Sequence, residues 1–338
     1  MLMFIITVST VLYFIIVSVT GMDHSSLPFD HFPSIQTLSP TVKITDPNQR
    51  LLFIGDVHGN YDELIQLLKD HQYWKDGELI TDPQTLQITL LGDFLTKGPD
   101  SLKVADFILD HKESVGCVLG NNEIMVLLSI LNPNHKFKIP LKFTTERNFL
   151  PENDKDDDYW DVIKPRSKHY KVAQELGILK LAQLAQHCSV VKKFDLKLSD
   201  DLIFGVHAGL LPGDFLLDKK GGDSFQRIPS IISLVDMKYV NYKNWYEVSR
   251  DIDDVKHGIR WYKLWEEYYA EKPPGKNQKN ITVIYGHDAH NGLTLHEHTK
   301  GLDSACAKGG YLSSLEYEFD PETSHYNTHL RQVPCNRV

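Results

Sequence analysis

Short apolar runs that each end in an acidic, amide or imidazole side chain recur along this chain of 338 residues. The first run, Leu51–Ile54, leads into Gly-Asp-Val-His-Gly at residues 55–59. A short apolar run bounded by turn residues predicts a buried strand. The chain must therefore fold so that several strands present polar side chains at their ends. The matching fragments are Gly-Asp-Phe-Leu-Thr-Lys-Gly-Pro (92–99), Gly-Asn-Asn-Glu (120–123), Val-His-Ala-Gly-Leu (206–210) and Tyr-Gly-His-Asp (285–288).

Predicted strands and helices alternate in the first part of the chain, which indicates an α/β core with parallel strands. Later segments are mostly strands. Together they predict one catalytic domain at 50–338 with two packed sheets. The expected strands are 51–55, 85–91, 115–119, 202–206, 281–285, 302–306, 311–319 and 327–332, and the expected helices are 60–72, 101–111, 123–131, 172–187 and about 257–271.

The stretch at about 132–170 breaks this alternation and is predicted to be an insertion. It contains a basic segment at 136–147 and an acidic run at 154–158. The basic segment would extend a groove for a long polyanion or, equally, form a solvated loop whose charge the acidic run nearly balances. The net charge of −9 excludes a protein that coats nucleic acid, so no nucleic-acid partner is expected, and the sixteen His favour metal chemistry.

The N-terminus is predicted to anchor the chain in a membrane. Residues 2–20 carry no charge and are rich in Ile, Val, Phe and Leu, and a membrane span needs about 20 such residues. We therefore expect a transmembrane signal-anchor at 1–21, with a signal peptide cleaved near Gly21 as the alternative. Residues 22–49 are expected to be a linker. The acidic residues after the apolar run place the catalytic domain in the lumen, as a single-pass membrane protein.

The four Cys residues form no Cys-x-x-Cys pair. Cys117 and Cys306 lie in strand-like apolar segments, so buried free thiols are the preferred interpretation. A disulfide that involves Cys188 or Cys335 remains open.

The polar residues at the strand ends have the chemistry of metal ligands. Asp56 and His58 are two residues apart and therefore point the same way from an extended strand end. Carboxylate, amide and imidazole groups suit divalent transition metals, and two such ions promote hydrolysis at phosphorus. Each residue alone has an ordinary alternative as a helix cap or turn residue. The predicted set is Asp56, His58, Asp93, Asn121, His207 and His287.

The fragments resemble those of the calcineurin-like metallophosphoesterases, and within them the phosphoprotein-phosphatase superfamily. Three segments are similar to the ApaH-like phosphatase subgroup, namely Lys97–Ser101, His287–Leu293 and Gly301–Cys306. The resemblance covers about residues 50–320. With the predicted anchor, the pattern is most similar to fungal vacuolar members that hydrolyse polyphosphate with zinc. It implies a four-layer α/β/β/α sandwich.

This resemblance also implies roles for individual residues. Asp56, His58 and Asp93 would hold a first metal, while Asp93, Asn121, His207 and His287 would hold a second. The ions would be Zn, Mn, Co, Fe or Mg. Lys97 stands where protein phosphatases carry a phosphate-binding Arg, and Arg260 would be a second phosphate clamp, with an exposed surface Arg as the alternative. Asp303 would orient the site through hydrogen bonding.

Asn122 departs from the family pattern, which has His at this position as the acid that protonates the leaving oxygen. General acid catalysis supplies ~10²–10⁴-fold, and an Asn delivers no proton at neutral pH. Three interpretations remain open: a natural variant for substrates with good leaving groups, an engineered His→Asn change, or a weak or inactive enzyme that still binds phosphates. Phosphoanhydrides, which leave as stabilised phosphates, fit Asn122 best.

The leading hypothesis is therefore a two-metal hydrolase of internal phosphoanhydride bonds in inorganic polyphosphate, with the catalytic domain in a vacuolar lumen. A second hypothesis is an ApaH-like hydrolase of dinucleoside polyphosphates or RNA caps. It needs an aromatic platform for a base, for which the candidates are Trp160, Tyr170, Trp261 and Tyr262. A third hypothesis is a Ser/Thr protein phosphatase, which Lys97 disfavours, and a fourth is a silent polyphosphate-binding protein.

Overall fold

Residues 34–338 of the computed structural model form a unit that is built around two β-sheets. The predicted anchor and most of the predicted insertion lie outside the described residues, as does Trp160. Residues 32–33, 35–80, 82–131, 141–142, 165–214, 229–271 and 279–337 are described.

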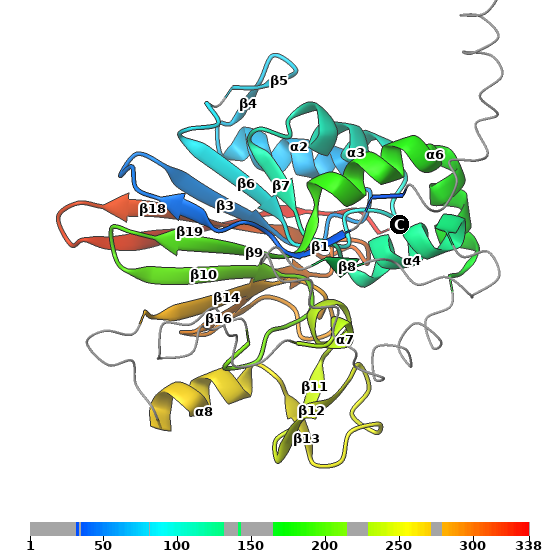
Figure 1. Ribbon diagram of the computed structural model, residues 1–338. Coiled ribbons are helices and arrows are strands. Elements are labelled where there is room, and N and C mark those ends of the chain that lie inside the picture. The colour runs from blue at the N-terminus through cyan, green and yellow to red at the C-terminus, as the bar shows by residue number, and fades with distance from the viewer. Residues whose placement is uncertain are drawn as a thin grey trace, which may run out of the picture. The chain divides into compact units, whose positions relative to one another are not determined.

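Two β-sheets face each other at the centre of the unit (Figure 1). Among the described strands, the first sheet has the order β15-β16-β14-β10-β9-β1-β8, with β2 paired to β9. The second has the order β17-β18-β3-β6-β7, with β19 paired to β18. The first sheet consists of β1 (Ile35–Leu38), β2 (Val42–Ile44), β8 (Leu141–Lys142), β9 (Ser189–Leu196), β10 (Asp201–Val206), β14 (Ile281–Tyr285), β15 (Thr294–Leu295) and β16 (Thr299–Gly301). The second consists of β3 (Arg50–Ile54), β6 (Leu86–Leu90), β7 (Val115–Cys117), β17 (Asp303–Ser304), β18 (Tyr311–Asp320) and β19 (His325–Pro334).

Helices cover the outer faces of both sheets (Figure 1). Helix α2 shows why: its buried residues Leu64, Ile65, Leu67 and Leu68 form one apolar stripe against the second sheet. The described helices are α2 (Tyr61–Asp70), α3 (Ser101–Asp110), α4 (Asn121–Leu131), α6 (Ser167–His187), α7 (Ile231–Val235) and α8 (Lys263–Glu271). Smaller sheets are formed by β4 (Trp74–Lys75) with β5 (Glu78–Leu79), and by β11 (Tyr239–Asn241), β12 (Asn244–Ser249) and β13 (Gly258–Arg260).

The core lies between the two sheets. Phe53 of β3 meets Phe194 of β9 edge to face, with ring centroids 5.3 Å apart, and also meets Tyr317 of β18. All three side chains are buried, and each buried side chain of this size contributes about 2 kcal/mol. This packing fixes the two sheets against each other.

Parallel pairing aligns the strand ends that carry the polar motifs. Strand β3 pairs in parallel with β6, and β6 with β7, while β10 pairs in parallel with β14 in the other sheet. The carboxyl ends of parallel strands meet at one edge of a sheet. The predicted α/β core with two packed sheets is confirmed.

The structure corrects the predicted linker at 22–49. Strand β1 pairs in parallel with β9 and β8, and β2 pairs with β9. The polar composition of this segment concealed two short strands at the side of the first sheet. Residues 35–38 and 42–44 of the predicted linker are therefore strands of the first sheet.

The structure also corrects the predicted localisation. Across the described part of the chain, no helix has the length and apolar character needed to cross a bilayer. The described part of the chain gives no support to the prediction of a single-pass protein of the vacuolar membrane. The predicted anchor at residues 2–20 lies outside the described residues.

The Cys residues form disulfides, so the preferred interpretation of free thiols is wrong. Cys117 at the end of β7 is bonded to Cys188, which precedes β9, and Cys306 is bonded to Cys335. Spacing alone did not reveal these pairs because 71 and 29 residues separate their partners. Disulfides of this kind are typical of proteins that fold in an oxidising compartment.

Removing either disulfide is expected to destabilise the fold through the unfolded state. Closing loops of 71 and 29 residues gives about 4 kcal/mol for each bridge, and the longer loop contributes more by about 1 kcal/mol. Urea unfolding of Cys117→Ala/Cys188→Ala and Cys306→Ala/Cys335→Ala would measure both losses. Equal unfolding free energies for the wild type and the first double variant would contradict the assignment.

Candidate metal centre

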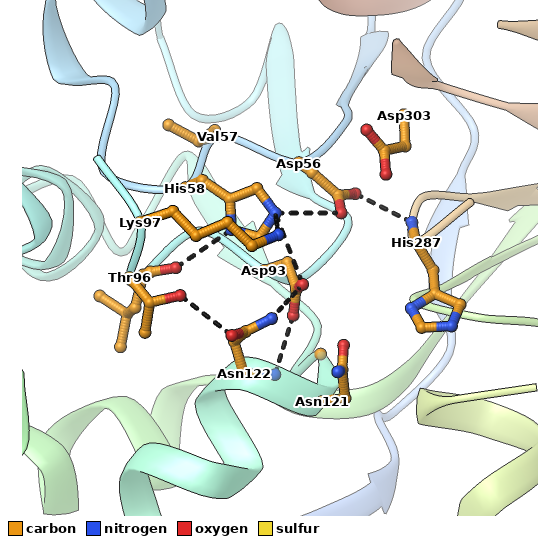
Figure 2. A network of polar contacts seen from close by, with 12 residues as sticks. Asp56, Val57, His58, Asp93, Thr96, Lys97, Asn121, Asn122, His287 and Asp303 are labelled. Atoms are coloured by element: carbon orange, nitrogen blue, oxygen red, sulfur yellow. Dashed lines mark hydrogen bonds and ion pairs between the residues drawn. The ribbon is translucent and has the colours of Figure 1, made fainter. Parts of the chain in front are cut away.

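Six polar side chains meet at the aligned strand ends, and Figure 2 labels each of them except His207. Asp56 and His58 follow β3, Asp93 follows β6, and Asn121 opens α4 just after β7. From the other sheet, His207 follows β10 and His287 follows β14. All six are at most 6% exposed, so they depend on one another rather than on water.

The backbone is strained at several of these positions. His58, Asp93 and His287 have φ values of 50°, 50° and 68°, and Thr96 and Lys97 of the neighbouring loop have 68° and 64°. Left-handed φ is uncommon outside Gly, and such residues gather at functional sites.

Two motif glycines are required by close approach. A Cβ on Gly286 would lie 2.1 Å from Asp56 Oδ1, and one on Gly120 would lie 2.4 Å from Asp93 Oδ1. Any side chain at either position would displace a carboxylate. This explains why the strands end in Gly before the polar residues.

The first group of converging atoms consists of Asp56, His58 and Asp93, whose ligand atoms all lie within 4.8 Å of one another. His58 Nδ1 lies 3.3 Å from the Leu95 carbonyl, to which it can only donate. The Nε2 lone pair then faces Asp56 Oδ2 at 3.7 Å and Asp93 Oδ2 at 3.6 Å. Three acceptors that face one another fit a cation, and the Lys97 ammonium contacts His58 Nε2 among them.

The second group also consists of acceptor atoms, and these face the other carboxylate oxygen of Asp93. His207 Nδ1 lies 2.8 Å from the Leu91 carbonyl, so its Nε2 carries the lone pair. That atom faces Asp93 Oδ1 at 3.4 Å and the Asn121 amide at 3.2 Å. Asn121 can present its oxygen to a cation or, turned over, donate its nitrogen to Asp93 and His207. Asp93 is thus shared by both groups.

Electrostatics distinguish the two inner carboxylates. Burial would raise the pKa of Asp93, but His207, His58 and Lys97 hold it well below its usual range. Burial and the charges of Asp303 and Asp93 raise the pKa of Asp56 well above its usual value. Asp303 is buried beside Asp56, and burial raises its pKa as well. Buried acids whose pKa values are shifted in opposite directions are typical of a functional site.

His287 joins the site from one side only. Its backbone N–H donates to Asp56 Oδ1 at 3.0 Å, and its ring packs edge-on against His207 with centroids 5.0 Å apart. Its Nε2 lies 3.1 Å from the Asp236 backbone carbonyl, so this nitrogen carries the proton and donates to that oxygen. Nδ1 remains as the ring's lone-pair atom.

Lys97 and Arg260 lie in different surroundings. The Lys97 ammonium contacts His58 Nε2, at the centre of the first group. Arg260 pairs with Asp288 and stacks on the Tyr239 ring at 4.4 Å. It is therefore held beside the His287 loop rather than exposed as a free surface residue.

Asn122 occupies the position where the family has an acid, and all of its polar groups are engaged. Its backbone N–H donates to Asp93 Oδ1 at 2.9 Å, and its side-chain nitrogen donates to Asp93 Oδ2. Its oxygen accepts from Thr96 Oγ1 at 3.0 Å, Lys168 Nζ at 2.9 Å and His169 Nε2 at 3.2 Å. Asn122 is thus a connector, not a proton donor.

Sequence reasoning missed several residues of this site. Glu123 accepts from the backbone N–H groups of Asp93, Leu95 and Gly120 at 2.7–2.9 Å, and so holds two strand ends together. Burial and Asp93 raise its pKa to about 8. Its place in Gly-Asn-Asn-Glu was an available signal. Lys168 and His169 gave none, because they are 46 and 47 residues from Asn122.

The donor set fits divalent transition metals. Imidazole nitrogens, carboxylates and one amide oxygen match Zn, Mn, Co or Fe, and less well Mg, which favours oxygen ligands alone. Asp93 is placed to contact two ions at once. Among the described residues a second acidic group, Glu266, Glu297 and His298, is partly exposed and lies away from these strand ends.

Comparison with known proteins agrees with this geometry. Residues 49–323 match the family described as calcineurin-like phosphoesterase. A "Zinc-dependent endopolyphosphatase" of Saccharomyces cerevisiae is 43% identical over 92% of this chain and 89% of its own. A "Bis(5'-nucleosyl)-tetraphosphatase, symmetrical" of Marinomonas sp. is 26% identical over 78% of this chain and 92% of its own.

A solved structure shows the same fold. The crystal structure of a putative diadenosine tetraphosphatase superposes with a TM-score of 0.54 at 18% identity, over 90% of this chain and all of that one. The resemblance inferred from the strand-end motifs is confirmed. The chain belongs to the calcineurin-like phosphoesterase family.

Proposed function

We propose that this protein is a two-metal phosphohydrolase that cleaves internal phosphoanhydride bonds of inorganic polyphosphate. The observation that carries the proposal is the state of Asn122, whose amide is wholly engaged with Asp93, Thr96 and α6. A site without a proton donor there favours a leaving group that departs as a stable anion. An internal phosphate of polyphosphate is such a group. The similarity to a zinc-dependent endopolyphosphatase supports the same substrate.

The residues divide into three roles in this proposal. Asp56, His58 and Asp93 would hold one ion, and Asp93, Asn121, His207 and His287 the other. Bound there, the ions would supply positive charge to phosphoryl oxygens and a water ionised near neutral pH. Lys97 would bind a flanking phosphate as a point charge. Arg260, which pairs with Asp288, would bind a second flanking phosphate. Asp303 would orient Asp56.

Two of the four candidate platforms for a nucleobase are buried. Trp261 is 2% exposed and Tyr262 is 9% exposed, so neither offers a flat face to a ligand. Instead, Trp261 packs against Tyr285 in the core. Dinucleoside polyphosphates remain the second candidate because of the tetraphosphatase relatives. The anhydride chemistry is common to both substrates.

A substrate panel tests the proposal. The protein, stripped by a chelator and reloaded with Zn, Mn, Co or Mg, is expected to cut long polyphosphate into fragments of intermediate length, seen on polyacrylamide gels. Diadenosine tetraphosphate and a phosphopeptide are the comparison substrates. Cleavage of the phosphopeptide alone would refute the proposal, and binding without cleavage would indicate a silent polyphosphate-binding protein.

Asp93→Asn is expected to separate metal binding from folding. The change removes the carboxylate shared by both groups, so metal content should fall from two ions per chain and activity by more than about 100-fold, since even outer-shell changes cost 10–100-fold. The apo fold should survive because one buried charge is lost. Elemental analysis and thermal unfolding would check this. Asp62→Asn on the surface of α2 is the matched control. Two ions retained by Asp93→Asn would remove the bridging role.

A further inference from the structure

Three donors converge on one oxygen next to the metal centre. Asn122 Oδ1 accepts from Thr96 Oγ1, Lys168 Nζ and His169 Nε2, at 2.9–3.2 Å. An amide oxygen has two lone pairs. The Asn122 oxygen therefore has fewer lone pairs than donors. One of the three donors is held less strongly than the others and is the one most easily turned toward a ligand.

His169 is not that donor, because its ring is fixed. Its Nδ1 accepts from the Arg166 backbone N–H at 2.8 Å, so the proton of the neutral ring lies on Nε2, which donates to Asn122. Burial and the charge of Lys168 lower the pKa of His169 to about 4. The ring is thus neutral at physiological pH, and both of its nitrogens are used.

Lys168 has the properties that a ligand contact needs. Its side chain is half-buried at the first turn of α6. An ammonium has three N–H donors, and among the described residues that of Lys168 forms one hydrogen bond, to Asn122. The Lys168 ammonium interacts electrostatically with the charges of Lys97 and Asp93. A second cation this near Lys97 is costly unless an anion comes between them.

We propose that Lys168 is a catalytic residue of this site, whose ammonium turns from Asn122 to the oxygen of the departing phosphate and stabilises its charge. The inference rests on the proposed function, since it takes the leaving group to be a phosphate. Asn122 serves as the resting partner of Lys168. Lys168 thereby does by charge what the family's His does by proton transfer.

The chemistry balances without a protein acid. An oxygen of water bonds to phosphorus while the bridging P–O bond breaks, and the electron pair of that bond stays on the departing oxygen. The protons of the water pass to product phosphate and solvent. Lys168 keeps its proton and donates a hydrogen bond to the departing oxygen. Donors that stabilise charge developing in the transition state are among the largest contributors to catalysis.

Steady-state kinetics of Lys168 variants test the inference. Lys168→Gln is expected to lower kcat on polyphosphate by ~10²–10³-fold, as for loss of one donor to a developing oxyanion, with KM changed little. Lys168→Arg should recover much of that loss because the charge is retained. On 4-nitrophenyl phosphate, whose leaving group needs less help, the loss should be much smaller. Lys171→Gln, an exposed site on the same helix, is the matched control.

For the comparison to hold, thermal unfolding and metal content of the Lys168 variants must match those of the wild type. Asn122→Ala is a second variant, which removes the hydrogen-bond partner of Lys168 but keeps Lys168 itself. Unchanged kcat in Lys168→Gln, or equal losses on both substrates, would overturn the inference. The ratio of variant to wild type is taken on whichever phosphoanhydride the wild type cleaves. Cleavage of diadenosine tetraphosphate but not polyphosphate would therefore refute only the proposed substrate.

Discussion

The buried carboxylate of Asp93 is the group on which the rest of the site depends. His58 faces one of its oxygens and His207 the other, and Asn122 donates to both. Glu123 holds the backbone of Asp93 in its left-handed conformation. A charge buried this deeply is tolerated only when it is paired. The two sheets and three loops that meet here are arranged to provide that pairing.

The structure brings the predicted ligands together because each of them lies close to the end of a strand. Each predicted ligand follows its own apolar run by one to four residues, so recognising the strand located the side chain. Parallel pairing then brought Asp56, Asp93 and Asn121 to one edge without any further information. The same argument predicted the α/β core and most of its helices.

What the sequence did not reveal depends on contacts between distant segments. Lys168 reaches Asn122 only because α6 returns across α4, and no periodicity records that path. The partners of Cys117 and Cys306 are set by strand order in the same way. Strand β9 was missed because Lys192 and Lys193 interrupt its apolar pattern, and β1 because its neighbours are polar. Composition is a weak guide where a strand is short or its pattern broken.

The Cys117–Cys188 bond links the end of α6 to β7. Helix α6 is held at its first turn by Asn122 and, just past its last residue, by the bridge to β7. Helix α4 is likewise fixed at its start by Glu123. The chain that connects the two helices therefore joins elements whose positions are set elsewhere. Reduction of the Cys117–Cys188 bond would therefore free the end of α6 from β7 while its first turn stays held at Asn122.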